Sequence, residues 1–273
     1  MKVCLAQMKP CLGDTYKNLE IMKIWIEKGI EEKVDLIVFP ELSLTGNMLE
    51  ELVCDVAIKK VPEELIELSK KISIIFGAVE LGEDSYIYNS AFYLENGELV
   101  NTYRKVYLPT YGMNDEGRYF KAGNNLSSFD TKFGKIGLLM GEDLKHQTSP
   151  FILAQDGATR VFILSNNAVC GIEKNIELGR DLDAMALSAA IANGIFIASV
   201  NRVGVEDGVS FYGKSKVFAP TGEILYEGKL LEEEYILVDL SQDYIRRARV
   251  SNPIAKGENL ALVLKELKRI WVR

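Results

Sequence analysis

The chain has few of the residues that bind metals or form disulfides. It contains one histidine, His146, and its four cysteines, Cys4, Cys11, Cys54 and Cys170, form no C-x-x-C pair. Zinc sites combine closely spaced cysteines and histidines, so this distribution does not favour a zinc site. Cys4 lies in an apolar stretch, where a cysteine is typically a small core residue.

Long apolar runs are also missing, and we expect no secretory leader. No run is long enough to span a bilayer, and the first residues already have the pattern of a strand. We therefore expect a cytoplasmic protein that does not enter a membrane. The net charge of −7 argues against a nucleic-acid partner, because the basic segment Arg246–Arg249 is too short to form a basic face.

Repeats, low-complexity segments and linkers rich in proline, glycine or serine are absent as well. The 273 residues therefore predict a single domain over 1–273, with its core over about 1–240 and a tail over 241–273. A domain of this length can bury a core without disulfides or metals.

Short β-rich runs alternate with amphipathic stretches, which is typical of a mixed α/β fold. Apolar residues recur at helical spacing over Asn18–Lys33, and Val34–Phe39 is a continuous apolar run typical of a buried strand. Asn96 and Gly97 predict the tight turn of a hairpin. Further strands are predicted over 3–7, 72–80, 88–94, 98–103, 135–140, 161–164, 195–200, 215–219, 223–228 and 235–240, and further helices over 63–71, 150–155, 176–192 and 260–270.

Three separate segments fit one catalytic apparatus. Glu41 and Lys105 follow predicted strands, and a third strand runs into a tight acidic turn. Such a turn is the usual place for an activated cysteine or serine, but here it holds Gly141. The segments read Phe39-Pro40-Glu41, Tyr103-Arg104-Lys105 and Lys135-Ile136-Gly137-Leu138-Leu139-Met140-Gly141-Glu142-Asp143.

In this order, the segments resemble the three motifs of the nitrilase superfamily, the carbon–nitrogen hydrolases. Residues 111–116 and 141–143 are most similar to the branch of NAD synthetase glutaminase domains and related free-standing amidases. The resemblance implies a four-layer α-β-β-α sandwich with mixed sheets and outer helices. It also implies hydrolysis of a small carboxamide to a carboxylate and ammonia, no metal or organic cofactor, and a homodimer or larger assembly.

The resemblance further implies a role for each site residue. Glu41 would transfer the proton, Lys105 and the backbone N–H of Glu142 would stabilise the oxyanion, and Glu116 would position Lys105 and contact substrate. Asn166 lies in a loop that would border the pocket for a small amide or carboxylate. Each of these residues also has an ordinary structural interpretation: Glu41 could cap a helix, Lys105 could be a surface lysine, and Glu116 could be an acidic loop residue. Because the motifs occur together and in order, a functional site is favoured.

Gly141 stands where the family has its cysteine, and a glycine cannot attack a carbon. The nearest candidate thiol is Cys170, in the predicted pocket loop, although a core or pocket-lining role is favoured for it. His146 is expected near the pocket mouth or in solvent. A glutamate-lysine-cysteine mechanism would therefore be disabled.

Two explanations fit the glycine: a substitution introduced to trap a substrate, or a natural pseudoenzyme that binds a metabolite or regulates a partner. Lys145 and Asn114 stand where the related branch usually has aromatic residues, which favours the second explanation. A third alternative is hydrolysis through Cys170 or through a water activated by Glu41.

Overall fold

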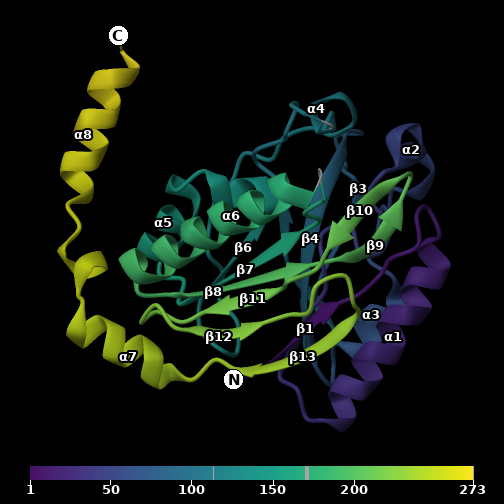
Figure 1. The fold of residues 1–273 in the computed structure, drawn as a ribbon, viewed down its shortest axis with the longest axis horizontal. Helices are drawn as coiled ribbons and strands as arrows, with labels where there is room; N and C mark the ends of the chain where they lie inside the picture. The colour runs from purple at the N-terminus through teal and green to yellow at the C-terminus, as the bar shows by residue number, and fades with distance from the viewer. Residues whose placement is uncertain (113, 170–171, 273) are drawn as a thin grey trace.

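Two stacked β-sheets form the centre of the molecule in a computed structural model that describes residues 1–112, 114–169 and 172–272. Helices cover the outer face of each sheet, which gives the predicted four-layer sandwich (Figure 1). The first sheet has the order β13-β1-β2-β3-β4-β5, and the second has the order β12-β11-β8-β7-β6. A separate pair is formed by β9 and β10.

The strands of the first sheet are β1 (Lys2–Gln7), β2 (Leu36–Val38), β3 (Ser73–Leu81), β4 (Ile87–Glu95), β5 (Glu98–Arg104) and β13 (Glu234–Asp239). The other strands are β6 (Ile136–Met140), β7 (Arg160–Ser165), β8 (Phe196–Asn201), β9 (Val203–Glu206), β10 (Val209–Tyr212), β11 (Lys216–Phe218) and β12 (Ile224–Glu227). The helices are α1 (Thr15–Glu31), α2 (Val53–Val56), α3 (Glu63–Leu68), α4 (Glu116–Tyr119), α5 (Thr148–Gln155), α6 (Ile172–Asn193), α7 (Gln242–Ser251) and α8 (Leu260–Trp271).

The outer face of the first sheet is covered by α1 and α3. Met22 and Ile26 of α1 are buried together with Ile37 and Phe76 from the strands. These α1 residues are four apart and lie on one face of the helix, so the predicted helical periodicity is confirmed. β2 pairs in parallel with both β1 and β3 and is fully buried, as its continuous apolar run indicates.

The second sheet is covered by α5 and α6. A side chain at Gly137 in β6 would meet Leu153 of α5 at 2.7 Å, so the glycine permits this close approach. The apolar residues of β6 belong to one buried cluster that also contains Leu5 and Val38 of the first sheet and Leu153 of α5.

The predicted hairpin between β4 and β5 is confirmed, with positive φ angles of 54° at Asn96 and 83° at Gly97. All the predicted strands and helices are present, with boundaries shifted by a few residues. β2 is shorter than the apolar run 34–39 that predicted it. The β9–β10 hairpin, α7 and the one-turn helices α2 and α4 were not predicted.

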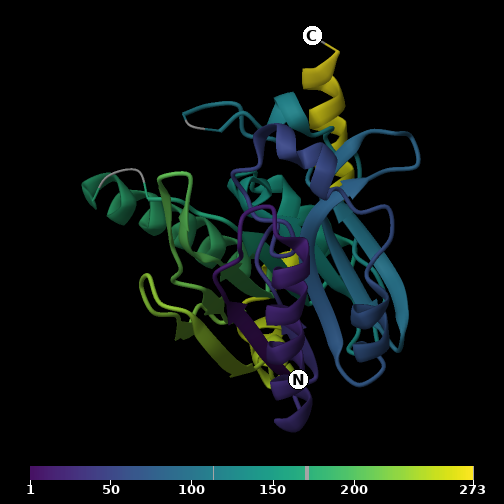
Figure 2. The ribbon, with the colours of Figure 1, turned by 90° about the vertical axis from the view of Figure 1, so that its right-hand side faces the viewer.

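The tail contains two helices of different character. Ile245 and Ala248 of α7 are buried, and Ile245 packs into the same core cluster as the second sheet, but α8 has no buried residue. α8 points away from the sheets, and the two termini lie at opposite ends of the molecule (Figure 2). Among the described residues, no helix combines the length and apolar composition needed to cross a bilayer.

Candidate active site

Glu41, Lys105 and Glu116 converge beside Gly141. The Lys105 ammonium lies between two carboxylates and donates to Glu41 Oε1 at 2.7 Å and to Glu116 Oε1 at 2.7 Å. Side-chain exposure is 0% for Glu41 and 2% for Lys105. Glu41 lies in the turn after β2, Lys105 follows β5 directly, and Glu116 begins α4.

The turn that carries Glu41 is fixed against β3. A side chain at Gly77 would approach the Leu42 backbone nitrogen to 2.5 Å, so only a glycine lets the turn pack this closely. The Leu44 N–H donates to the Gly77 carbonyl at 3.0 Å. Because residues 41–45 form a turn rather than the start of a helix, the helix-cap reading of Glu41 is wrong.

Asn89 forms hydrogen bonds with both residues of the Glu41–Lys105 ion pair. Its Nδ2 donates to Glu41 Oε1 at 2.7 Å, and its carbonyl accepts the Lys105 N–H at 2.9 Å. The sequence pattern did not indicate this role of Asn89.

The turn that begins at Gly141 is held by a buried aspartate. Asp143 accepts hydrogen bonds from the Tyr103 hydroxyl at 2.7 Å, the Met140 N–H at 3.0 Å and the Tyr107 N–H at 2.9 Å. Burial raises the pKa of Asp143, and it also raises the pKa of Tyr103. Asp143 therefore joins the Gly141 turn to the chain on either side of Lys105.

Burial and charge compete within this cluster. Desolvation acts to lower the pKa of Lys105, but Glu116 and Glu41 outweigh it, and the pKa of Lys105 is raised. Burial raises the pKa of Glu116 to about 7, against the opposing attraction of the Lys105 ammonium. Glu116 can therefore change its charge near neutral pH.

Gly141 faces the Oε2 atom of Glu41, which accepts no hydrogen bond from the described residues. Its φ angle is +24°, and an added Cβ would lie 3.0 Å from Glu41 Oε2 and 4.0 Å from Asn166 Oδ1. A side chain at this position would thus point at the carboxylate.

Residues 2–250 match the family model described as carbon-nitrogen hydrolase. The chain belongs to the carbon-nitrogen hydrolase family. The glutamine-dependent NAD(+) synthetase of Thermotoga maritima is 31% identical over 263 residues, which are 93% of this chain and 44% of that protein. The chain thus spans about half the length of this relative.

A probable nitrilase of Schizosaccharomyces pombe is 31% identical over 245 residues, covering 85% of this chain and 84% of that protein. An amidase of Nesterenkonia sp. has the same fold, with a TM-score of 0.79, 23% identity and 99% coverage of both chains. That structure shows acrylamide added to an active-site cysteine. These comparisons confirm the predicted superfamily and fold.

A cavity of about 200 Å³ opens beside the candidate site. Glu142 and Asn166, both expected at the pocket, line it together with Lys105, Glu116 and Gly141. Asn166 donates to the Asn47 side chain, which also lines the cavity.

The rim of this cavity carries a polar triangle. Tyr111 donates to Glu142 at 2.7 Å, and Lys145 donates to both Tyr111 and Glu142 at 2.7 Å. His146 is exposed and stacks on Tyr107, in agreement with its expected place near the pocket mouth or in solvent. Cys170 lies outside the described residues.

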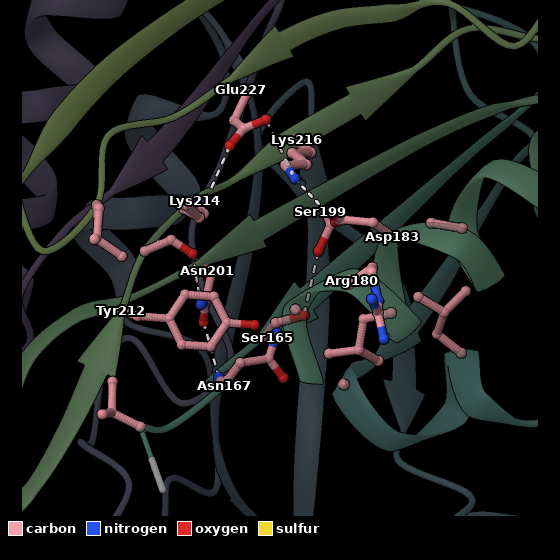
Figure 3. Close-up of a pocket in the computed structure, with 18 of the residues that line it drawn as sticks. Ser165, Asn167, Arg180, Asp183, Ser199, Asn201, Tyr212, Lys214, Lys216 and Glu227 are labelled. Atoms are coloured by element: carbon pink, nitrogen blue, oxygen red, sulfur yellow. Dashed lines mark hydrogen bonds and ion pairs between the residues drawn. The ribbon is translucent and has the colours of Figure 1, made fainter. Parts of the chain in front are cut away.

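A second cavity of about 580 Å³ also borders Gly141, and it shares Asn167 with the first. Figure 3 shows Lys216 near Asp183 and Glu227 in its wall, and both pairs are ion pairs. The sequence pattern did not indicate this cavity, because its wall comes from β8, β11, β12 and α6. Within the described residues, no cluster of three potential metal ligands occurs.

Proposed function

We propose that this carbon-nitrogen hydrolase binds a small carboxamide or carboxylate, in the cytoplasm, and that amide hydrolysis is disabled at Gly141. The observation that carries the proposal is the buried Lys105, held between Glu41 and Glu116 and beside Gly141. The 200 Å³ cavity has room for a small amide.

The buried groups can supply two parts of amide chemistry. Lys105 carries a positive charge that can stabilise an oxyanion, and Glu41 can accept and return a proton. The third part is a nucleophile, and Gly141 has no side chain to supply it. The related amidase, with its active-site cysteine, supports this reading of position 141.

Loss of the nucleophile from a cooperating triad lowers turnover by about 10⁶. We therefore expect ammonia release from propionamide or glutamine to stay at background with the unaltered chain. The variant Gly141→Cys should release ammonia well above background. Because φ is +24° at Gly141, the new side chain adds strain of about 1–2 kcal/mol, so thermal unfolding must show that the variant is folded. Robust hydrolysis by the unaltered chain would contradict the proposal.

A second candidate function is that of a metabolite-binding or regulatory subunit. The 580 Å³ cavity beside Gly141 favours it, because this volume is typical of small-molecule sites. A thermal-shift screen of amides, amino acids and nucleotides separates the candidates. Stabilisation by a ligand that Gly141→Cys does not hydrolyse would favour the regulatory subunit.

We also propose that the chain forms a homodimer or larger assembly through its tail. Residues 242–273 contain eight lysines and arginines but only three acidic residues, a net charge of +5, whereas residues 1–241 carry −12. One face of α8 is apolar, although none of its residues is buried. An acidic second copy of the chain would complement this basic, apolar tail.

A further inference from the structure

The Glu41 carboxylate is only half satisfied. Its Oε1 accepts from Lys105 at 2.7 Å and from Asn89 at 2.7 Å. Its Oε2 is buried and has no hydrogen-bond partner among the residues that the structure describes. Buried carboxylate oxygens normally accept a hydrogen bond, so Oε2 points to a donor that the described chain does not provide.

The place for that donor is the space beside Gly141. An added Cβ at Gly141 would be 3.0 Å from Oε2, and the other described atom within 4 Å would be Asn166 Oδ1 at 4.0 Å. Both cavities border Gly141, so this space lies on a route that small molecules can use. A small molecule that places one acidic hydrogen beside Oε2, with the rest of the molecule in an adjoining cavity, fits the geometry.

We propose that a low-molecular-weight thiol enters this space from solution, donates its S–H to Glu41 Oε2 and serves as the attacking group. This inference rests on the proposed function, because it needs a carboxamide bound beside Lys105. A thiol is favoured over water by acidity. Thiol pKa values lie near 8.5 and that of water is 15.7, so a carboxylate removes the thiol proton more easily by about seven pK units.

The reaction balances without an oxidant or reductant. The thiol gives its proton to Glu41 Oε2 as the sulfur–carbon bond forms, and the carbonyl π electrons move to oxygen beside Lys105. The carbon–nitrogen bond then breaks while Glu41 returns the proton to nitrogen, which leaves as ammonia. The products are a thioester and ammonia, and water converts the thioester to a carboxylate and the free thiol.

The test measures ammonia released from propionamide by the full chain, with and without 2-mercaptoethanol. Ethylene glycol has the same shape with oxygen in place of sulfur and tests the need for a thiol. Tris(2-carboxyethyl)phosphine is a reductant without a thiol and tests whether 2-mercaptoethanol acts only by reducing a protein cysteine. We expect release to rise at least about ten-fold with 2-mercaptoethanol alone, in proportion to its concentration.

Two variants locate the effect. Glu41→Gln should lower the thiol-dependent rate by about 10²-fold or more, because it removes the proton acceptor. Gly141→Ala should abolish the rate, since its methyl group occupies the space beside Oε2. Gly194→Ala is the matched control, with a φ of +62° and no neighbour within 4 Å, and it should keep the rate.

The outcomes separate this inference from the proposed function. Hydrolysis by Gly141→Cys with no thiol response in the unaltered chain would overturn the inference and leave the proposed function standing. Equal rates with the phosphine, or with no additive, would overturn it as well, because Cys170 or water would then suffice. If propionamide causes no thermal shift and no variant releases ammonia, the proposed function itself fails.

Discussion

At the scale of single residues, the site is a set of buried charges that constrain one another. Lys105 is shared by Glu41 and Glu116, so neither carboxylate has the ammonium to itself. The effect of burial is clear at Glu116, because it raises the pKa of this carboxyl from 4.5 to about 7. A group whose pKa is raised on folding binds its proton more tightly in the folded state, which links stability to pH.

The sign of that link gives a prediction for Glu116. Its contribution to stability is complete below pH 4.5 and is lost as the pH rises through about 7. We expect urea unfolding to show a fall of about 3 kcal/mol between pH 4.5 and pH 7.5 from this group. Glu116→Gln should remove this part of the pH dependence, so the difference in unfolding free energy between the variant and the unaltered chain should change across that range. Parallel curves would contradict the raised pKa.

At the scale of elements, the site depends on turns held by hydrogen bonds from neighbouring strands. Asp143 joins the Gly141 turn to Tyr103 at the end of β5 and to the Tyr107 backbone. The positions of Lys105 and Gly141 are therefore coupled through one carboxylate.

Asp143→Asn tests that coupling. An amide retains one acceptor oxygen but cannot satisfy the donors now shared by two oxygens, and a lost buried hydrogen bond costs about 1–3 kcal/mol. We expect the variant to lose about 2 kcal/mol of unfolding free energy in urea and to show a smaller thermal shift with propionamide. Asp55→Asn, on the exposed side of α2, is the control and should stay within about 0.5 kcal/mol. Unchanged stability and binding in Asp143→Asn would show that the turn does not need this anchor.

The sequence predicted most elements because their apolar periodicity reflects one-sided burial, as Met22 and Ile26 show in α1. It missed α7, where only Ile245 and Ala248 are buried among arginines, so the apolar pattern is weak. It missed the β9–β10 hairpin although Asp207-Gly208 is a typical turn pair. The motifs predicted that Glu41, Lys105 and Glu116 meet.

The anchoring roles of Asn89 and Asp143 were not predicted, because they depend on contacts between distant segments. Asn89 reaches Glu41 across 48 positions of sequence, and Asp143 reaches Tyr103 across 40. The 580 Å³ cavity was missed for the same reason, since α6 and several strands each contribute part of its wall. Periodicity describes one element at a time and cannot report such contacts.

At the scale of the whole molecule, charge and apolar surface are unevenly distributed. The body is acidic and the tail basic, and α8 exposes an apolar face that a single copy does not cover. Exposed apolar surface of this kind is typical of an interaction site. The residues of this face follow helical spacing and are Leu260, Val263, Leu264, Leu267, Ile270 and Trp271.

The proposed self-association therefore predicts a contrast between two leucines of α8. Leu264 lies on the apolar face, whereas Leu262 lies on the opposite face, and the two are almost equally exposed at 55% and 52%. Leu264→Asp should weaken self-association about 30-fold, equivalent to about 2 kcal/mol, because it places a charge in an apolar contact. Leu262→Asp introduces the same charge and should leave the assembly intact.

Sedimentation equilibrium over a range of concentrations measures both variants of α8 against the unaltered chain. Raising the salt concentration should weaken the assembly of the unaltered chain, because screening reduces attraction between the basic tail and the acidic body of a second copy. An unaltered chain that stays monomeric at all concentrations, or equal loss of assembly in the two leucine variants, would contradict a specific role for this face. Leu264→Asp and Leu262→Asp introduce the same charge on opposite faces of α8. A difference in self-association between them therefore requires that the Leu264 face contacts the second copy.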